Sequence, residues 1–238
     1  MAKTTQVHYR SPEEGVRRAL AWLDSHSTAA TLEGMVRYGI PSGNATGVAM
    51  KEMQALGKML GRDHELALAL WQSGVYEARM VASFVDDPAQ VTPEQMDRWC
   101  AEFDNWAICD TVCFHLFDRT PHAWAKVTEW STLPGEFARR TAFALLWSLA
   151  LHDRRATDEQ FCAGLALIEL AAADDRNFVK KAVNMALKAI GKRNLALNAA
   201  AVAVARRLAD SQEPGPRWVG KDATRELTSP AVTRRIKE

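Results

Sequence analysis

The sequence predicts an all-α fold in which short helices pair and stack as an α-solenoid. Strand signals are almost absent, with no sustained alternation of β-branched residues and no Asn-Gly or Asp-Gly hairpin turn. Helix-start signals recur instead, each followed by an amphipathic segment of about 10 to 18 residues. Short helices joined by short polar turns over 238 residues fit a solenoid of paired helices better than a four-helix bundle. Because solenoids curve and this chain carries a basic run, we expect a concave basic cleft.

The predicted helices begin where a hydroxyl side chain precedes a proline or an acidic turn. Ser11-Pro12 and Thr92-Pro93 each combine an N-cap hydroxyl, a proline at the first helical position and an acid or amide two residues later. Thr157 has the form of a capping box, and Thr120-Pro121 and Ser229-Pro230 mark two more starts. In chain order the predicted helices are 11–25, 28–37, 44–60, 63–72, 75–85, 93–102, 106–118, 121–131, 135–151, 157–172, 175–191, 195–210 and a short one at 219–227.

We expect these helices to form one domain over residues 1–238. No position recurs strictly at one period, which is usual for helical arrays of about 40 residues per repeat. Residues 1–10 are predicted to be flexible. The Pro-Gly-Pro at 214–216 interrupts the helical pattern, so 211–238 is predicted to be a C-terminal tail with one short helix.

Composition and cysteine usage indicate a globular intracellular protein. Hydrophobic residues make up 47% and charged residues 25% of the chain. The N-terminus lacks the apolar core of a signal peptide, and no window reaches the ~18 apolar residues of a membrane span. The four cysteines show no paired framework, so we expect reduced thiols in the cytoplasm. Cys109, Cys113 and His115 lie close enough for zinc, but no matching second ligand pair exists, and buried cysteines are the favoured interpretation.

The net charge of +1 hides a strongly basic C-terminal part. Residues 176–238 contain 14 Lys and Arg against 5 Asp and Glu, and residues 176–209 contain no acid. Within that run one face of a helix repeats basic or polar residues every four positions. Its members are Lys180, Asn184, Lys188 and Lys192, with Lys181 and Met185 adjacent. Such a lysine row without an acid would repel itself, and a bound polyphosphate backbone would relieve the repulsion. The alternative is a solvated basic face without a partner.

Two other places carry residues suited to chemistry on an anionic polymer. Asp110 lies in the apolar interior of predicted helix 106–118, one turn after Trp106. Burying an unpaired carboxylate costs several kcal/mol, so such a group is usually paired, lines a cleft or is catalytic. The alternative is a core tryptophan beside an aspartate paired with an arginine. Arg139 and Arg140 form a doublet whose forked guanidinium groups suit phosphate, although a salt bridge to an acid is the favoured interpretation for Arg139.

Four stretches together make the chain resemble a known family. They are Leu-Trp-Gln-Ser-Gly-Val-Tyr-Glu-Ala-Arg at 70–79, Asp-Asn-Trp through Asp-Thr-Val at 104–112, Arg-Arg-Thr-Ala at 139–142 and Asn-Phe-Val-Lys-Lys-Ala at 177–182. With them the chain, from about residue 38 to 227, is similar to the HEAT-like-repeat DNA alkylation repair proteins, the AlkC/AlkD-type alkylpurine DNA glycosylases. The resemblance implies an α-solenoid of HEAT-like repeats that excises cationic N3- or N7-alkylated purines from duplex DNA.

The resemblance also implies roles for individual residues. Asp110 matches the family's catalytic carboxylate, Trp106 the aromatic that packs against the lesion's deoxyribose, and Arg140 the arginine that holds the DNA backbone. One departure concerns the family's second cleft tryptophan, which is replaced here by Met185. Methionine can pack on a sugar or base but has no π face. The resemblance therefore implies an altered lesion clamp, and Trp147 or Trp218 are alternatives for that role.

Three hypotheses follow. The first is a monofunctional glycosylase, the second a non-enzymatic DNA-binding HEAT module, and the third a protein-interaction scaffold. For the DNA-binding hypotheses we expect sequence-independent backbone contacts from Arg140 and the lysine row. We expect no metal and no organic or nucleotide cofactor, since no Gly-rich phosphate loop is present. Without a heptad seam we expect a monomer, cytoplasmic and associated with a bacterial nucleoid when bound to DNA.

Overall fold

The predicted all-α class is confirmed. The computed structural model describes residues 8–236, which form helices and turns without a strand. The chain divides into two compact units, with the boundary between Pro121 and His122. The single domain expected over 1–238 stays a prediction. Residues 1–7 of the segment expected to be flexible lie outside the described residues, whereas Tyr9 in the same segment donates a hydrogen bond from its hydroxyl to Asp63 at 2.7 Å.

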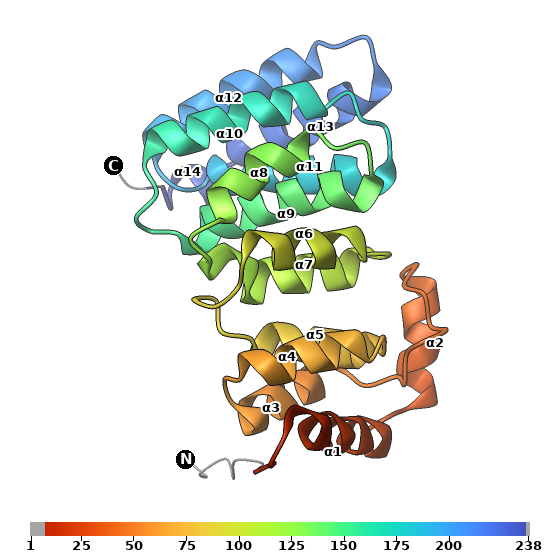
Figure 1. The fold of residues 1–238 in the computed structure, drawn as a ribbon. Coiled ribbons are helices and arrows are strands. Elements are labelled where there is room, and N and C mark those ends of the chain that lie inside the picture. The colour runs from red at the N-terminus through yellow and green to blue at the C-terminus, as the bar shows by residue number, and fades with distance from the viewer. Residues whose placement is uncertain (1–7, 237–238) are drawn as a thin grey trace. The chain divides into compact units, whose positions relative to one another are not determined.

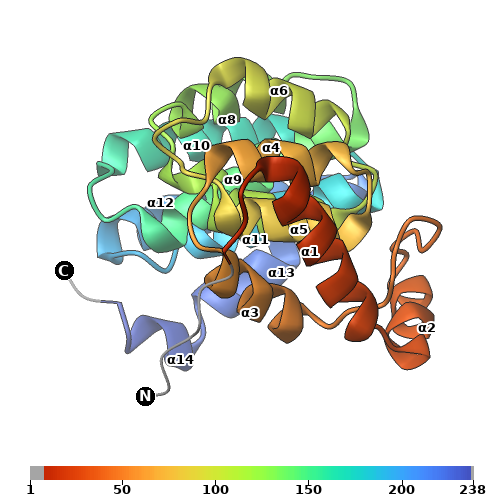
Figure 2. The ribbon, with the colours of Figure 1, turned by 60° about the horizontal axis from the view of Figure 1, so that its bottom comes forward.

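The first unit contains seven α-helices and a short 3₁₀ turn among its described residues (Figure 1). They are α1 (Pro12–Ser25), α2 (Ala29–Arg37), α3 (Met50–Leu60), α4 (His64–Gln72), α5 (Tyr76–Val85), α6 (Pro93–Ala101), α7 (Trp106–His115) and η1 (Phe117–Arg119). Helix α5 packs against α3, α4 and α7, so it lies at the centre of this unit. Helix α2 stands apart from α3, α4 and α5 in both views (Figures 1 and 2).

The second unit stacks its helices as pairs in two layers. Its members are α8 (Ala123–Ser131), α9 (Glu136–His152), α10 (Asp158–Ala171), α11 (Asn177–Ile190), α12 (Leu195–Ala209), α13 (Pro214–Leu227) and α14 (Pro230–Thr233). Helices α9, α11 and α13 pack side by side in one layer, while α8, α10 and α12 follow one another in the other (Figure 1). Because α8 also packs on α9 and α12 on α13, successive helices form the pairs of a helical repeat.

Most predicted starts are where the sequence placed them. Ser11 and Thr92 accept hydrogen bonds from the third backbone N–H of α1 and α6, and Thr157 forms the complete capping box of α10. Ser229 precedes α14. The predicted start at Thr120-Pro121 is wrong. The hydroxyl of Thr120 donates a hydrogen bond back to the carbonyl oxygen of Phe117, which closes a turn, and α8 begins only at Ala123.

Three predicted boundaries need correction for physical reasons. The helix predicted at 44–60 begins only at Met50, because the backbone N–H groups of residues 46–48 are bound by the Glu77 carboxylate and Gly47 has a φ of +87°. The helix predicted at 106–118 ends at His115, before the 3₁₀ turn. The helix predicted at 219–227 begins at Pro214, since proline needs no N–H partner in a first helical turn. Residues 214–227 therefore form a full helix packed on α11 and α12.

The described part of the chain lacks both a membrane-spanning helix and a metal-binding cluster. None of its helices combines the length and apolar character needed to cross a membrane. It also contains no group of three His, Cys, Asp or Glu side chains placed to hold a metal ion. Cys109 and Cys113 are buried free thiols, and burial raises the pKa of the Cys113 thiol well above its usual value.

Candidate functional site

The start of α7 fixes the positions of Trp106 and Asp110. The buried side chain of Asn105 accepts hydrogen bonds from the N–H groups of Ala107 and Ile108, at 3.0 and 3.1 Å, so the helix begins at Trp106. Four residues later Asp110 lies on the same side of the helix. Both side chains are half-buried, which leaves each partly accessible to a ligand.

Trp106 is held by the polypeptide between α2 and α3. Its indole N–H donates to the carbonyl oxygen of Tyr38 at 3.0 Å. Its ring packs on a small apolar cluster that contains Met35, Ile40 and Ala107. The ring is therefore fixed in orientation before any ligand binds, as a platform for a sugar or base requires.

Glu77 organises that same region, although sequence reasoning did not single it out. Its side chain is fully buried and accepts hydrogen bonds from the backbone N–H groups of Thr46, Gly47 and Val48, at 2.9, 2.7 and 3.3 Å. Ala45 and Tyr76, which flank these bonds, both pack against the cluster beneath Trp106. The only signal in the sequence was an acid inside the apolar run at 75–82, and nothing in it indicated which segment the carboxylate would bind.

In the second unit, α11 and the turn after it carry the predicted lysine row, and acids lie against that row. Lys188 lies 3.0 Å from a carboxylate oxygen of Asp222 and 2.9 Å from one of Glu226, and Lys192 also pairs with Glu226. Burial lowers the pKa of Lys188, but the bonds to Glu226 and Asp222 raise it further, so the net shift is upward. The expected repulsion within the row is thus relieved by α13, and the inference of a bound polyphosphate loses that support.

The rest of the row is also engaged by α13. Asn184, which is buried, donates to Asp222 at 2.8 Å, and the ammonium group of Lys180 lies 5.5 Å from the ring of Trp218. On α13, Trp218, Asp222 and Glu226 follow one another at intervals of one helical turn. Their spacing therefore matches the spacing of the polar row on α11.

Most of the other cations in the acid-free run have partners as well. Arg176 binds Asp174, Arg207 binds Glu169, and Arg193 donates to two backbone carbonyls. By contrast, Lys181 is exposed and forms no ion pair within residues 8–236. Met185, one turn further along the same side of α11, is half-buried. Lys181 therefore differs from the row beside it, because within residues 8–236 it has neither the ion pairs of Lys188 and Lys192 nor the ring contact of Lys180.

The arginine doublet separates into two different environments. Arg139 pairs with Asp174 at 2.9 Å, as the sequence favoured. Arg140 is only 5% exposed, and it donates to the carbonyl oxygen of Phe178 at 2.7 Å, with the Phe178 ring 6.0 Å away. Its guanidinium group therefore links α9 to the first turn of α11.

The comparisons with known proteins agree with this architecture. The model of a family described as DNA alkylation repair enzymes matches residues 19–227. The chain belongs to that family. Among solved structures, one match is a protein from a family that is related to the HEAT-like repeat DNA glycosylases and has affinity for branched DNA structures. It is 18% identical, covers 88% of this chain and 94% of its own, and superposes with a TM-score of 0.74. No curated protein matches significantly.

At this identity the solved structure establishes the fold. The expected α-solenoid of HEAT-like repeats is thereby confirmed, and family membership supports a role in DNA repair and DNA binding. The matched range contains Trp106, Asp110, Arg140 and the whole of α11, so every residue to which a role was assigned lies inside the family region.

Proposed function

We propose that this protein is a monofunctional DNA glycosylase that hydrolyses the N-glycosidic bond of cationic N3- or N7-alkylated purines in DNA. The observation that carries the proposal is the pair formed by Trp106 and Asp110 on one side of α7, both half-buried, in a chain of the DNA alkylation repair enzyme family. An alkylated purine of this kind already bears a positive charge. Its base can therefore leave without being protonated.

The residues on α7 suit the remaining chemistry. When the bond between C1′ and the purine nitrogen breaks, its electron pair leaves with the base, and positive charge develops on the sugar. The Asp110 carboxylate stabilises that charge and orients a water molecule, whose oxygen bonds to C1′ while its second proton passes to solvent. The face of Trp106 favours the same developing cation. The products are the neutral alkylated base and an abasic site.

Contacts with the DNA backbone are proposed for the second unit. Lys181 is available as it stands, and Lys180 lies beside it over Trp218. Lys188 and Lys192 would have to exchange their carboxylate partners for phosphate, so we expect their contribution to be smaller. Arg140, which the resemblance assigns to the DNA backbone, stays proposed for that contact and also fixes the first turn of α11 through its bond to Phe178.

The test is single-turnover release of 7-methylguanine from methylated duplex DNA by the wild type and by Asp110→Asn. The proposal expects release by the wild type, loss of release in the variant, and equal affinity of the two proteins for the duplex. Asp24→Asn is the matched control, because Asp24 is an exposed acid on α1 of the same unit. Release by Asp110→Asn at the wild-type rate would contradict the assignment.

A second candidate is a DNA-binding protein without excision activity that prefers branched DNA. The affinity of the structurally similar family for branched DNA structures favours it, as does Met185 in place of the second cleft tryptophan. It expects tighter binding to a four-way junction than to a duplex of the same length, and no abasic product. Measuring both quantities on one preparation separates the two candidates.

A further inference from the structure

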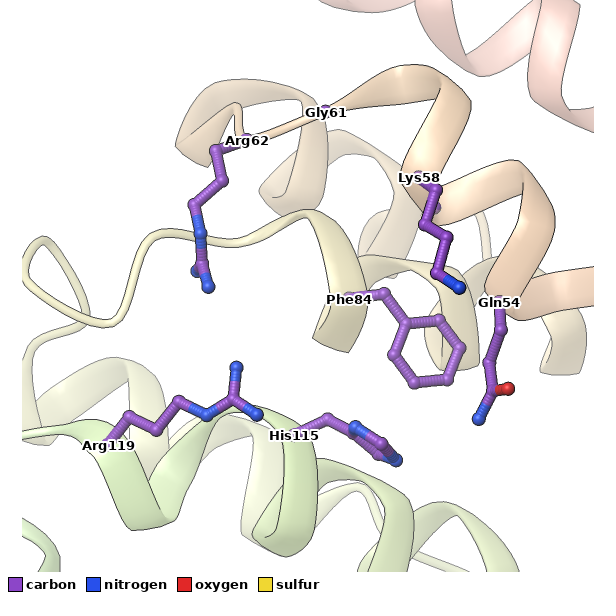
Figure 3. Close-up of a pocket in the computed structure, with 8 residues that line it drawn as sticks. Gln54, Lys58, Gly61, Arg62, Phe84, His115 and Arg119 are labelled. Carbon is purple, nitrogen blue, oxygen red and sulfur yellow. The ribbon is translucent and has the colours of Figure 1, made fainter. Parts of the chain in front are cut away.

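A cavity in the first unit lies apart from the site on α7 that carries Asp110. It has a volume of about 440 Å³ and lies where α3, α5 and α7 end (Figure 3). Its lining residues include three basic side chains together with two rings and an amide. They are Lys58, Arg62, Arg119, Phe84, His115 and Gln54. No carboxylate is among them.

The cations converge on the open space. Figure 3 shows the guanidinium groups of Arg62 and Arg119 pointing toward one another from opposite walls. Arg62 is placed there by Gly61, whose φ of +75° ends α3 and turns the chain, and it donates to the carbonyl oxygen of Asp86 at 2.6 Å. Arg119 forms an ion pair with the neighbouring Asp118, whose carboxylate oxygen lies 3.9 Å from its Nε, too far for a hydrogen bond.

The partial negative charges at the helix C-termini offset only part of the positive charge around the cavity. Each helix C-terminus carries about half a negative charge, so three ends offset roughly half of the charge of the three basic side chains. Lys58 is exposed and has no ion pair within the described residues. Asp118 beside Arg119 and Asp87 near Arg62 offset more of the positive charge, and a bound anion would neutralise what remains around the cavity.

The other wall is suited to a flat ring. Phe84 and His115 lie with their ring centroids 4.8 Å apart at an interplanar angle of 83°, so one ring presents its face where the other presents its edge. Gly57 makes this possible, because a Cβ there would meet the Cβ of Phe84 at 2.7 Å. Gln54 adds both a hydrogen-bond donor and an acceptor (Figure 3).

From these contacts we propose that the cavity binds a nucleotide unit, with its phosphate among Lys58, Arg62 and Arg119 and its base against Phe84. Arginine forks suit phosphate, aromatic faces stack on bases of any sequence, and the volume lies within the range of ~300–1,000 Å³ usual for small ligands. The unit can belong to a nucleic-acid strand or be a free nucleotide. The binding of either needs no excision by Asp110, and only the strand source rests on the proposed DNA binding.

The test is calorimetric titration of the full-length protein at low ionic strength. The probes are adenosine 5′-monophosphate, adenosine, inorganic phosphate, and one short single-stranded oligonucleotide with and without a 5′-phosphate. We expect the monophosphate or the oligonucleotide to bind, and adenosine and inorganic phosphate to bind at least about tenfold more weakly. Saturation by the monophosphate identifies a free nucleotide as a source; binding of the oligonucleotide alone identifies a strand.

Variants locate the binding. Arg119→Gln and Lys58→Gln should each weaken the effective probe by about tenfold or more, whereas Arg98→Gln, an exposed cation on α6 outside the cavity, should not. Lys58→Gln keeps the test valid if an arginine variant unfolds, because Lys58 holds no other element in place. The proposal is overturned if no probe binds, or if the lysine and arginine variants bind as Arg98→Gln does. Base release by Lys58→Gln, measured in parallel, reports the glycosylase separately.

Discussion

The buried carboxylate of Glu77 gives the sharpest stability prediction. Replacing it by alanine leaves the backbone N–H groups of Thr46, Gly47 and Val48 without their acceptor, and Gly47 and Val48 are buried. A buried donor that loses its partner costs about 1–3 kcal/mol, and water can reach the half-buried Thr46. We therefore expect Glu77→Ala to lower the free energy of unfolding by about 3–5 kcal/mol, and Glu77→Gln by about half as much, since one amide oxygen still accepts.

Thermal unfolding followed by circular dichroism measures this effect. At about 2–4 °C per kcal/mol for a chain of this size, Glu77→Ala should lower Tm by roughly 6–20 °C. Glu33→Ala is the matched control, because Glu33 is an exposed acid on α2 of the same unit. Tryptophan fluorescence should also report a changed environment at Trp106, which packs beside Ala45 and Tyr76. A change below about 1 kcal/mol for Glu77→Ala would refute the claim that this carboxylate holds residues 46–48.

Three further predictions concern the second unit. The hydrogen bond from Arg176, with a second from Arg139, lowers the pKa of Asp174 to about 2 from 3.8. The stabilisation by the ionised Asp174 is fully present above about pH 4 and is lost as pH falls through 2, so in urea titrations Asp174→Asn should cost about 1–2 kcal/mol at neutral pH and much less at pH 2. In DNA titrations at several salt concentrations, Lys181→Gln should reduce the log–log slope by about 0.9, whereas Lys188→Gln, which is already paired, should change it less. Met185→Trp should tighten binding to abasic-site DNA by about tenfold, since stacking contributes about 1–3 kcal/mol; unchanged affinity would exclude position 185 from the clamp.

Local signals were sufficient for most of the fold. The hydroxyls of Ser11, Thr92 and Thr157 cap helices because a cap needs only residues within one turn of it. The same local reading failed at residues 44–49, where Glu77, some thirty positions away, binds the backbone and delays α3. Apolar residues at helical spacing do not reveal whether a side chain from another helix binds the same backbone N–H groups.

The inference that no acid faces the lysine row was wrong for a related reason. Periodicity along α11 placed Lys180, Asn184 and Lys188 on one face, and the structure agrees. What lies against that face is decided by α13, whose start the sequence placed five residues too late, at 219 instead of Pro214. An acid-free stretch of sequence is therefore not an acid-free surface. The spacing of residues also could not show that Arg140 is buried and donates a hydrogen bond to the carbonyl oxygen of Phe178.

The carboxylate of Asp110 should lower the barrier to base release by an amount that follows from its charge. A unit negative charge about 4 Å from a developing positive charge stabilises it by about 4 kcal/mol at the effective dielectric constant of a partly exposed site, near 20. Since about 1.4 kcal/mol corresponds to tenfold in rate, Asp110→Asn should slow single-turnover base release by about a hundred- to a thousandfold. Because the departing base carries its own positive charge, no acid is needed, and the rate above neutral pH should stay flat. A loss below about tenfold would mean that the sugar is stabilised by another group, and the tryptophan face of Trp106 would be the next to test.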